Sequence, residues 1–61
     1  EIITITANSK INNIEIIDIL GARVLTTKST KINTNYLSKG KYIAIINLSD
    51  GRFIENKIII E

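Results

Sequence analysis

The fold is decided by the stretch KYIAIINLSDGR, residues 41–52. Successive side chains of a β-strand point to opposite faces, so residues two apart share a face. Both faces of Lys41–Leu48 carry aliphatic side chains, which is typical of a central, buried strand. The Asp50-Gly51 pair that follows is preferred in two-residue type I′ turns. The stretch therefore predicts an antiparallel hairpin that joins Lys41–Leu48 to Arg52–Ile60.

The rest of the chain has the same β character. Isoleucine and threonine are abundant, proline is absent, and apolar residues never recur at helical spacing for more than about one turn. Strands are predicted at Ile2–Thr6, Ile14–Leu20, Arg23–Thr27, Lys31–Thr34, Lys41–Leu48 and Arg52–Ile60. Six short strands in 61 residues predict a small all-β antiparallel sandwich.

Three connecting segments carry turn or loop residues. Leu20-Gly21-Ala22-Arg23 is expected to reverse the chain with a turn type different from that at Asp50-Gly51. The polar, asparagine-rich segment Asn8–Asn13 is expected to be a loop. Asn35–Gly40 is expected to form an irregular or 3₁₀ turn that buries Leu37.

Length and composition limit how the chain can be stabilised. A chain of 61 residues forms one domain at most and buries only about 60% of the surface that its unfolded form exposes. It has no cysteine for a disulfide, and without cysteine and histidine it lacks the usual zinc ligands. Aliphatic burial must therefore hold it together. The chain begins inside a predicted strand and without an initiator methionine, so residues 1–61 are expected to be one domain of a longer protein.

Several classes of function are disfavoured. The net charge of +2 arises from single, dispersed lysines and arginines, whereas nucleic-acid binders cluster their basic residues. No apolar run approaches the about 20 residues of a membrane-spanning helix. Without histidine or cysteine, and with carboxylates that do not converge, no catalytic site, cofactor site or metal site is expected. The three glycines are isolated, so no phosphate-binding loop can be written.

Physical reasoning alone gives one indication of function. Since both faces of the central strands are apolar and a small domain can cover only one of them, some isoleucines are expected to be exposed. Exposed apolar patches and free strand edges are typical of interaction surfaces. The alternative is that loops or neighbouring parts of a longer protein cover this second face.

Motifs along the chain carry a family resemblance. They are an aliphatic strand that ends in Asp18-Ile19-Leu20-Gly21, then Val24, then Leu37-Ser38-Lys39-Gly40-Lys41-Tyr42, then Asp50-Gly51, and finally the aliphatic strand around Lys57. In this order and spacing, over nearly the whole chain, they resemble the type A C-terminal sorting domain of type IX secretion cargo. The resemblance implies an immunoglobulin-like sandwich of about seven short strands at the C-terminus of an exported protein of a Gram-negative bacterium.

The resemblance also implies partners and a location. The family guides folded cargo through an outer-membrane translocon, is received by an outer-membrane β-barrel shuttle protein, and is often removed by a cell-surface sortase. The cargo is accordingly expected in the periplasm in transit to the outer membrane, and then at the cell surface or outside the cell. Two features depart from the family pattern: the Pro-Asn-Pro segment before the first strand is missing, and the chain ends in Ile60-Glu61 where basic residues are common.

Two sets of residues follow from the resemblance. The positions that match the family motif, expected chiefly to make the fold, are Gly21, Leu37, Gly40, Tyr42, Gly51 and Lys57. The candidate partner-binding residues, in the last hairpin and strand, are Asp50, Gly51, Arg52, Phe53, Lys57, Ile58, Ile59 and Ile60.

A structural role is the rival interpretation. An immunoglobulin-like or fibronectin-like spacer or adhesion module of a secreted protein could show the same strand pattern. Carbohydrate-binding modules usually expose aromatic side chains, and Tyr36 is the only credible candidate in this chain.

Overall fold

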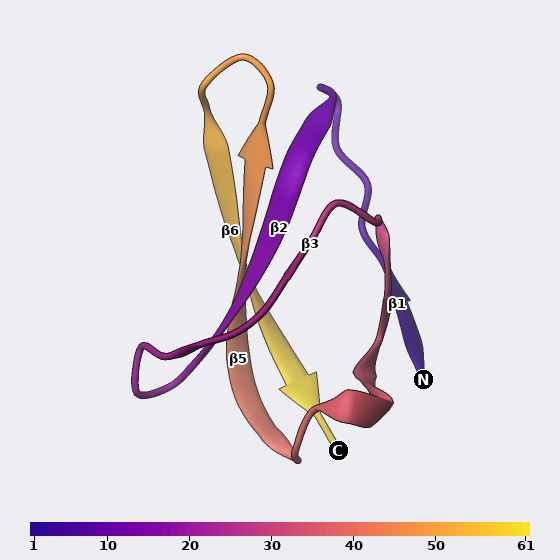
Figure 1. The fold of residues 1–61 in the computed structure, drawn as a ribbon, viewed down its shortest axis with the longest axis vertical. Coiled ribbons are helices and arrows are strands. Elements are labelled where there is room, and N and C mark those ends of the chain that lie inside the picture. Colours follow the sequence, from indigo (N-terminus) through magenta and orange to yellow (C-terminus); the bar gives the residue numbers. More distant parts are fainter.

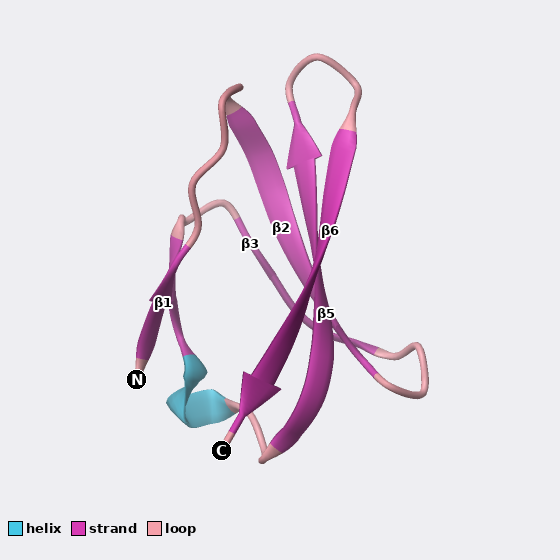
Figure 2. Ribbon diagram, turned by 180° about the vertical axis from the view of Figure 1, so that it is seen from behind, coloured by secondary structure: helices cyan, strands magenta, loops and turns pink.

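Two antiparallel sheets face each other in the computed structural model, which describes residues 1–61 (Figures 1 and 2). The four-stranded sheet has the order β3-β2-β5-β6, and the two-stranded sheet consists of β1 and β4. The strands are β1 (Ile2–Thr4), β2 (Ile11–Asp18), β3 (Arg23–Thr27), β4 (Lys31–Asn33), β5 (Gly40–Leu48) and β6 (Phe53–Ile60), and the 3₁₀ turn η1 (Thr34–Tyr36) links β4 to β5. The predicted small all-β antiparallel sandwich is confirmed, with the six strands expected from the residues.

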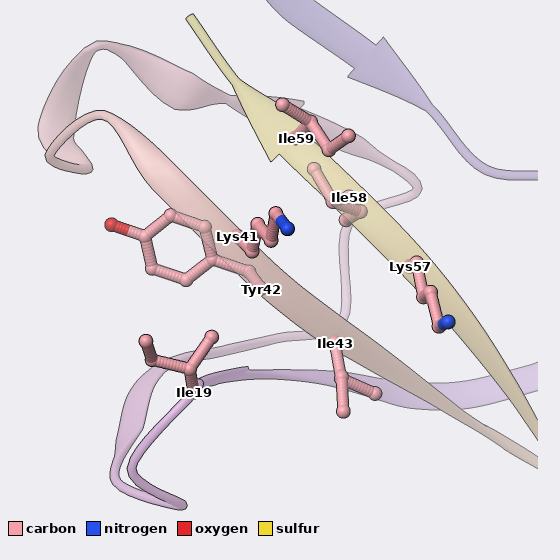
Figure 3. A pocket seen from close by; sticks show the side chains of 7 residues that line it. All are labelled: Ile19, Lys41, Tyr42, Ile43, Lys57, Ile58 and Ile59. Atoms are coloured by element: carbon pink, nitrogen blue, oxygen red, sulfur yellow. The ribbon is translucent and has the colours of Figure 1, made fainter.

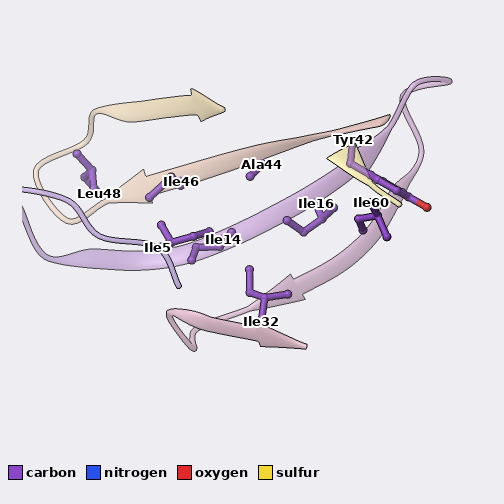
Figure 4. Packing of buried hydrophobic residues seen from close by; sticks show 9 residues of the cluster. All are labelled: Ile5, Ile14, Ile16, Ile32, Tyr42, Ala44, Ile46, Leu48 and Ile60. Carbon is purple, nitrogen blue, oxygen red and sulfur yellow. The ribbon is translucent and has the colours of Figure 1, made fainter. Parts of the chain in front are cut away.

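The core lies between the two sheets (Figure 4). Nine hydrophobic residues are buried there, and six of them come from the central strands β2 and β5. Ile14 and Ile16 on β2 lie opposite Ile46 and Ala44 on β5, so alternate residues of both strands point to the same side. Burying one such aliphatic side chain contributes about 1.5–3 kcal/mol. The core residues are Ile5, Ile14, Ile16, Ile32, Tyr42, Ala44, Ile46, Leu48 and Ile60.

The first connection differs from its sequence-based prediction. Asn8–Asn13 is not entirely a loop, because β2 already begins at Ile11 and contains a bulge between Ile11 and Asn13. The Asn13 side chain is satisfied by a contact that is remote in sequence: Asn47 Nδ2 on β5 donates to Asn13 Oδ1 at 2.8 Å. A polar residue can thus occupy a strand when its partner comes from another strand.

Strand ends also shift by one or two residues. β1 ends at Thr4 rather than Thr6, although Ile5 N still donates to Thr30 O at 2.8 Å. β2 ends at Asp18 rather than Leu20, because Asp18 begins the turn into β3. β4 ends at Asn33, whose side chain accepts a hydrogen bond from Asn35 N. This bond begins the 3₁₀ turn at Thr34–Tyr36, which starts before the predicted segment Asn35–Gly40 and is shorter than it. Leu37 follows this turn, half-buried against the core.

The two hairpin turns share one geometry, which corrects the prediction of two different types. In each turn a glycine N–H donates to the carbonyl three residues earlier: Gly21 to Asp18 at 3.0 Å and Gly51 to Leu48 at 3.2 Å. Both glycines have positive φ, 88° and 91°, and no other residue type in the chain does. Both turns are therefore type I turns followed by a left-handed glycine, a three-residue connection, and not type I′.

Candidate partner-binding surface

The outer face is the face of the four-stranded sheet that points away from β1 and β4. Opposed residues of an antiparallel pair share a face, so the β5–β6 register places Lys41, Ile43, Lys57 and Ile59 together on it. Ile59 is 66% exposed. Phe53, which lies on the same face at the beginning of β6, is 60% exposed. The expectation of exposed isoleucines on the second face is confirmed.

A shallow depression of about 280 Å³ lies at this part of the sheet (Figure 3). Two lysines, Lys41 and Lys57, border it together with apolar side chains. Neither lysine has a carboxylate partner, since the two ion pairs of the structure are made by Arg23 and Arg52. The depression therefore combines an apolar surface with two cations whose charge is not neutralised. Its lining residues are Ile19, Lys41, Tyr42, Ile43, Lys57, Ile58 and Ile59.

The other half of the outer face is polar and internally satisfied. Arg23 Nε on β3 pairs with Glu15 Oε2 on β2 at 2.9 Å. Asn47 Nδ2 donates to Glu15 Oε1 at 3.0 Å as well as to Asn13. These groups already have partners within the domain. The outer face is thus divided into a polar half around Glu15, Arg23 and Asn47 and an apolar, cationic half around the depression between β5 and β6.

The tip of the β5–β6 hairpin is fixed by local hydrogen bonds. Arg52 Nε donates to Asp50 Oδ2 at 2.7 Å, and Arg52 Nη2 donates to Ser9 Oγ at 2.9 Å. The hydrogen bond from the Arg52 guanidinium lowers the pKa of Asp50 below its usual value, and the same contact raises the pKa of Arg52. Ser49 N also donates to Lys10 O at 2.9 Å. These contacts tie the tip to the segment before β2.

The candidate partner-binding residues fall into four environments. Asp50, Gly51 and Arg52 form the hairpin tip, at the far end of β6 from the depression. Phe53 and Ile59 are exposed on the outer face, and Ile59 also lines the depression. The remaining ones line the depression or lie in the core: Lys57 and Ile58 line it, and Ile60 is buried among the core residues.

The family-motif positions lie mostly at turns and in the core. Gly21 and Gly51 close the two hairpins, and Gly40 opens β5. Tyr42 is buried, and its hydroxyl donates to Ser38 O at 2.6 Å, which fastens the η1–β5 connection. Leu37 packs against the core and Lys57 borders the depression.

Sequence reasoning did not single out three residues of the depression. Lys41 and Ile43 alternate with the motif residue Tyr42 along β5, so the alternation itself was a signal that they share the outer face with each other. Ile19 lies in the turn after β2, and only the folded structure brings it beside β5 and β6.

The turn at Gly51 offers a direct test of the hairpin. No atom lies within 4 Å of the position that a Cβ would take, so a side chain there would strain the backbone without a steric clash. We expect Gly51→Val to lower the free energy of unfolding by about 1–3 kcal/mol, because β-branched residues avoid positive φ. Gly51→Asn should cost less, because asparagine tolerates the left-handed region. Urea unfolding followed by circular dichroism measures both, and equal losses for the two variants would contradict the turn assignment.

Metal-ligating side chains do not gather in this fold. No group of three or more carboxylates is placed to hold a metal ion. The structure also has no helix with the length and hydrophobicity that crossing a membrane would require. The feature that distinguishes its surface is the apolar, cationic depression on the outer face.

Comparison with known proteins identifies the family. A family model described as a secretion system C-terminal sorting domain matches residues 1–61, the entire chain. No curated protein and no solved structure gives a significant match. The matched family is non-catalytic. The chain therefore belongs to the family of secretion system C-terminal sorting domains and is a sorting signal of the type IX secretion system.

Proposed function

We propose that the apolar, cationic half of the outer face is the surface by which the type IX machinery receives this sorting domain. The observation that supports this proposal is the depression between β5 and β6, where exposed isoleucines lie beside Lys41 and Lys57. Exposed apolar patches on small domains commonly mark interaction sites. The hairpin that carries the patch is held at its tip by Arg52, so the surface is presented without much loss of conformational entropy on binding.

The chemistry of the depression suggests what the receptor presents. An apolar ridge would fill the hollow, and carboxylates at its rim would face the two lysine ammonium groups. Such complementary charges speed the encounter and fix the orientation of the partners more than they add affinity. The receiving component in this proposal is the outer-membrane β-barrel shuttle protein, which takes the domain from the translocon.

The remaining steps of the proposal concern the cargo. The domain forms the C-terminal part of a longer exported protein, which passes from the periplasm through the translocon to the outer membrane. A sortase then attaches the cargo to the cell surface, or the cargo is released from the cell. In this scheme the sorting domain supplies the address, and the machinery supplies any catalysis.

Export of a reporter tests this function. A fluorescent protein that carries a signal peptide and residues 1–61 at its C-terminus is expressed in a type IX-competent host and in a translocon-deficient strain. We expect the reporter at the cell surface or in the medium of the competent host only, with periplasmic retention in the deficient strain. Retention of an intact, folded fusion in both strains would contradict the proposal and favour a spacer or adhesion role.

A further inference from the structure

The strand β6 leaves one of its two edges free. In the β5–β6 hairpin, Leu48 N donates to Arg52 O at 2.9 Å. Hydrogen-bonded pairs of an antiparallel ladder recur every second residue, so Ile54, Asn56 and Ile58 direct their backbone groups toward β5. The residues between them direct their N–H and C=O groups to the free edge, because β6 is last in the sheet order. These residues are Phe53, Glu55, Lys57 and Ile59.

The sequence of β6 suits antiparallel pairing with a second copy of the same strand. The stretch FIENKII, residues 53–59, has Asn56 at its centre. At equal distances from this centre lie an acidic and a basic residue, then two isoleucines, then an aromatic and an aliphatic residue. The symmetric pairs are Glu55 with Lys57, Ile54 with Ile58, and Phe53 with Ile59.

We propose that two copies of this domain pair through β6 in an antiparallel, two-fold symmetric dimer centred on Asn56. Glu55 of each copy then lies opposite Lys57 of the other, and Phe53 lies opposite Ile59. The two four-stranded sheets join into one continuous sheet, in which every backbone group of the free edge is paired. A C2 interface of this kind needs a self-complementary surface, and β6 provides one.

Two features of β6 select this register: the alternating direction of its backbone N–H and C=O groups, and the charges of Glu55 and Lys57. A slip by one residue would oppose edge-directed backbone groups to groups already bonded to β5. A slip by two residues would centre the pairing on Glu55 or on Lys57 and place like charges directly opposite each other. Like charges at opposed positions destabilise a strand pair. Among these registers, only the one centred on Asn56 avoids both penalties.

The dimer explains two exposed side chains, one of which, Ile59, also lines the outer-face depression. Phe53 and Ile59, 60% and 66% exposed in one copy, become cross-strand neighbours and shield each other. The contact is in the plane of the sheet, so the two depressions lie on the same side of the joined sheet, each bordered at the dimer contact by Lys57 and Ile59. The two proposals share Lys57 and Ile59, and they are distinguished by Glu55, which belongs only to the dimer contact, and by Lys41, which borders only the depression.

Cysteine cross-linking tests the register. In a non-hydrogen-bonded antiparallel pair the two Cα atoms lie about 4.5 Å apart, within disulfide range. Because the chain has no cysteine, Asn56→Cys should form a disulfide-linked dimer on mild oxidation. The matched controls Glu55→Cys and Lys57→Cys place each cysteine diagonally from its copy, beyond about 7 Å, and should cross-link slowly. Equal rates at all three positions on a non-reducing gel would overturn the proposed pairing.

Charge reversal tests the association itself. Sedimentation equilibrium from about 10 µM to about 1 mM should show the wild-type chain as a monomer–dimer equilibrium, because one-strand contacts are weak. Glu55→Lys and Lys57→Glu alone should each remove the dimer, and the double variant should restore it. Circular dichroism confirms that all three variants are folded. A wild-type chain that stays monomeric at about 1 mM, or a double variant that stays monomeric, would overturn the proposal.

Discussion

Alanine at position 14 should leave the domain largely unfolded at room temperature. Ile14 is completely buried (0% exposed) on the central strand β2, opposite Ile46 on β5. Isoleucine-to-alanine changes in such positions cost about 2–5 kcal/mol, because they remove apolar contacts and leave a cavity. A core of this size rarely supplies more than about 3–5 kcal/mol in total, and this chain has no disulfide to add to it.

Urea unfolding followed by far-UV circular dichroism measures this loss. The control is Ile2→Ala on β1, where the side chain is 64% exposed and the expected change is within about 0.5 kcal/mol. If Ile14→Ala and Ile2→Ala unfolded at the same urea concentration, the two-sheet core described above would be wrong.

Aspartate at position 59 should reduce export of the reporter by about tenfold or more. The change places a charge on the apolar surface of the depression, and an interface penalty of about 1.4 kcal/mol already corresponds to a factor of ten in affinity. Fold stability should change little, because Ile59 is mostly exposed. Release of the fluorescent reporter into the medium measures the effect.

The matched control for this experiment is Ile2→Asp. Ile2 and Ile59 are the same residue type, lie on edge strands and have nearly equal exposure, but Ile2 does not line the depression. Equal export of both variants would rule out the outer face as the receptor surface. Glu55→Lys adds a second control: it should break the dimer but not export, since Glu55 is not part of the depression.

Long strands with alternating side chains were predicted well. Features that depend on contacts with residues distant in the sequence were not. Lys41–Leu48 was predicted within one residue of β5, because its periodicity extends over the whole strand. The beginning of β2 was missed, because Asn13 is polar and its hydrogen bond from Asn47 cannot be read locally. The type of the turn at Asp50-Gly51 was wrong, because the pairing of Asn47 with Phe53 decides the length of the connection.

The candidate surface shows the same limit. Sequence reasoning placed it on the last hairpin and strand, and the exposure of Phe53 and Ile59 agrees with an interaction role there. The sequence could not show that Ile59 is exposed and Ile60 buried, because both faces of the strand are apolar. Only the position of the second sheet decides which face is covered. The contribution of Ile19 depends on the position of a turn relative to a distant hairpin, which no local pattern encodes.

The pairing of β2 with β5 also has a consequence for the order of folding events. Each flanking hairpin closes through a three-residue connection, whereas the contact between Asn13 and Asn47 spans 34 residues of chain. Hairpins form within about 1–10 µs, but distant strands must first lose the entropy of the intervening chain. We expect the two hairpins to form early and their docking to limit the rate of folding. The free edge of β6 and the outer face would then acquire their final shape in a single step, when the two hairpins meet.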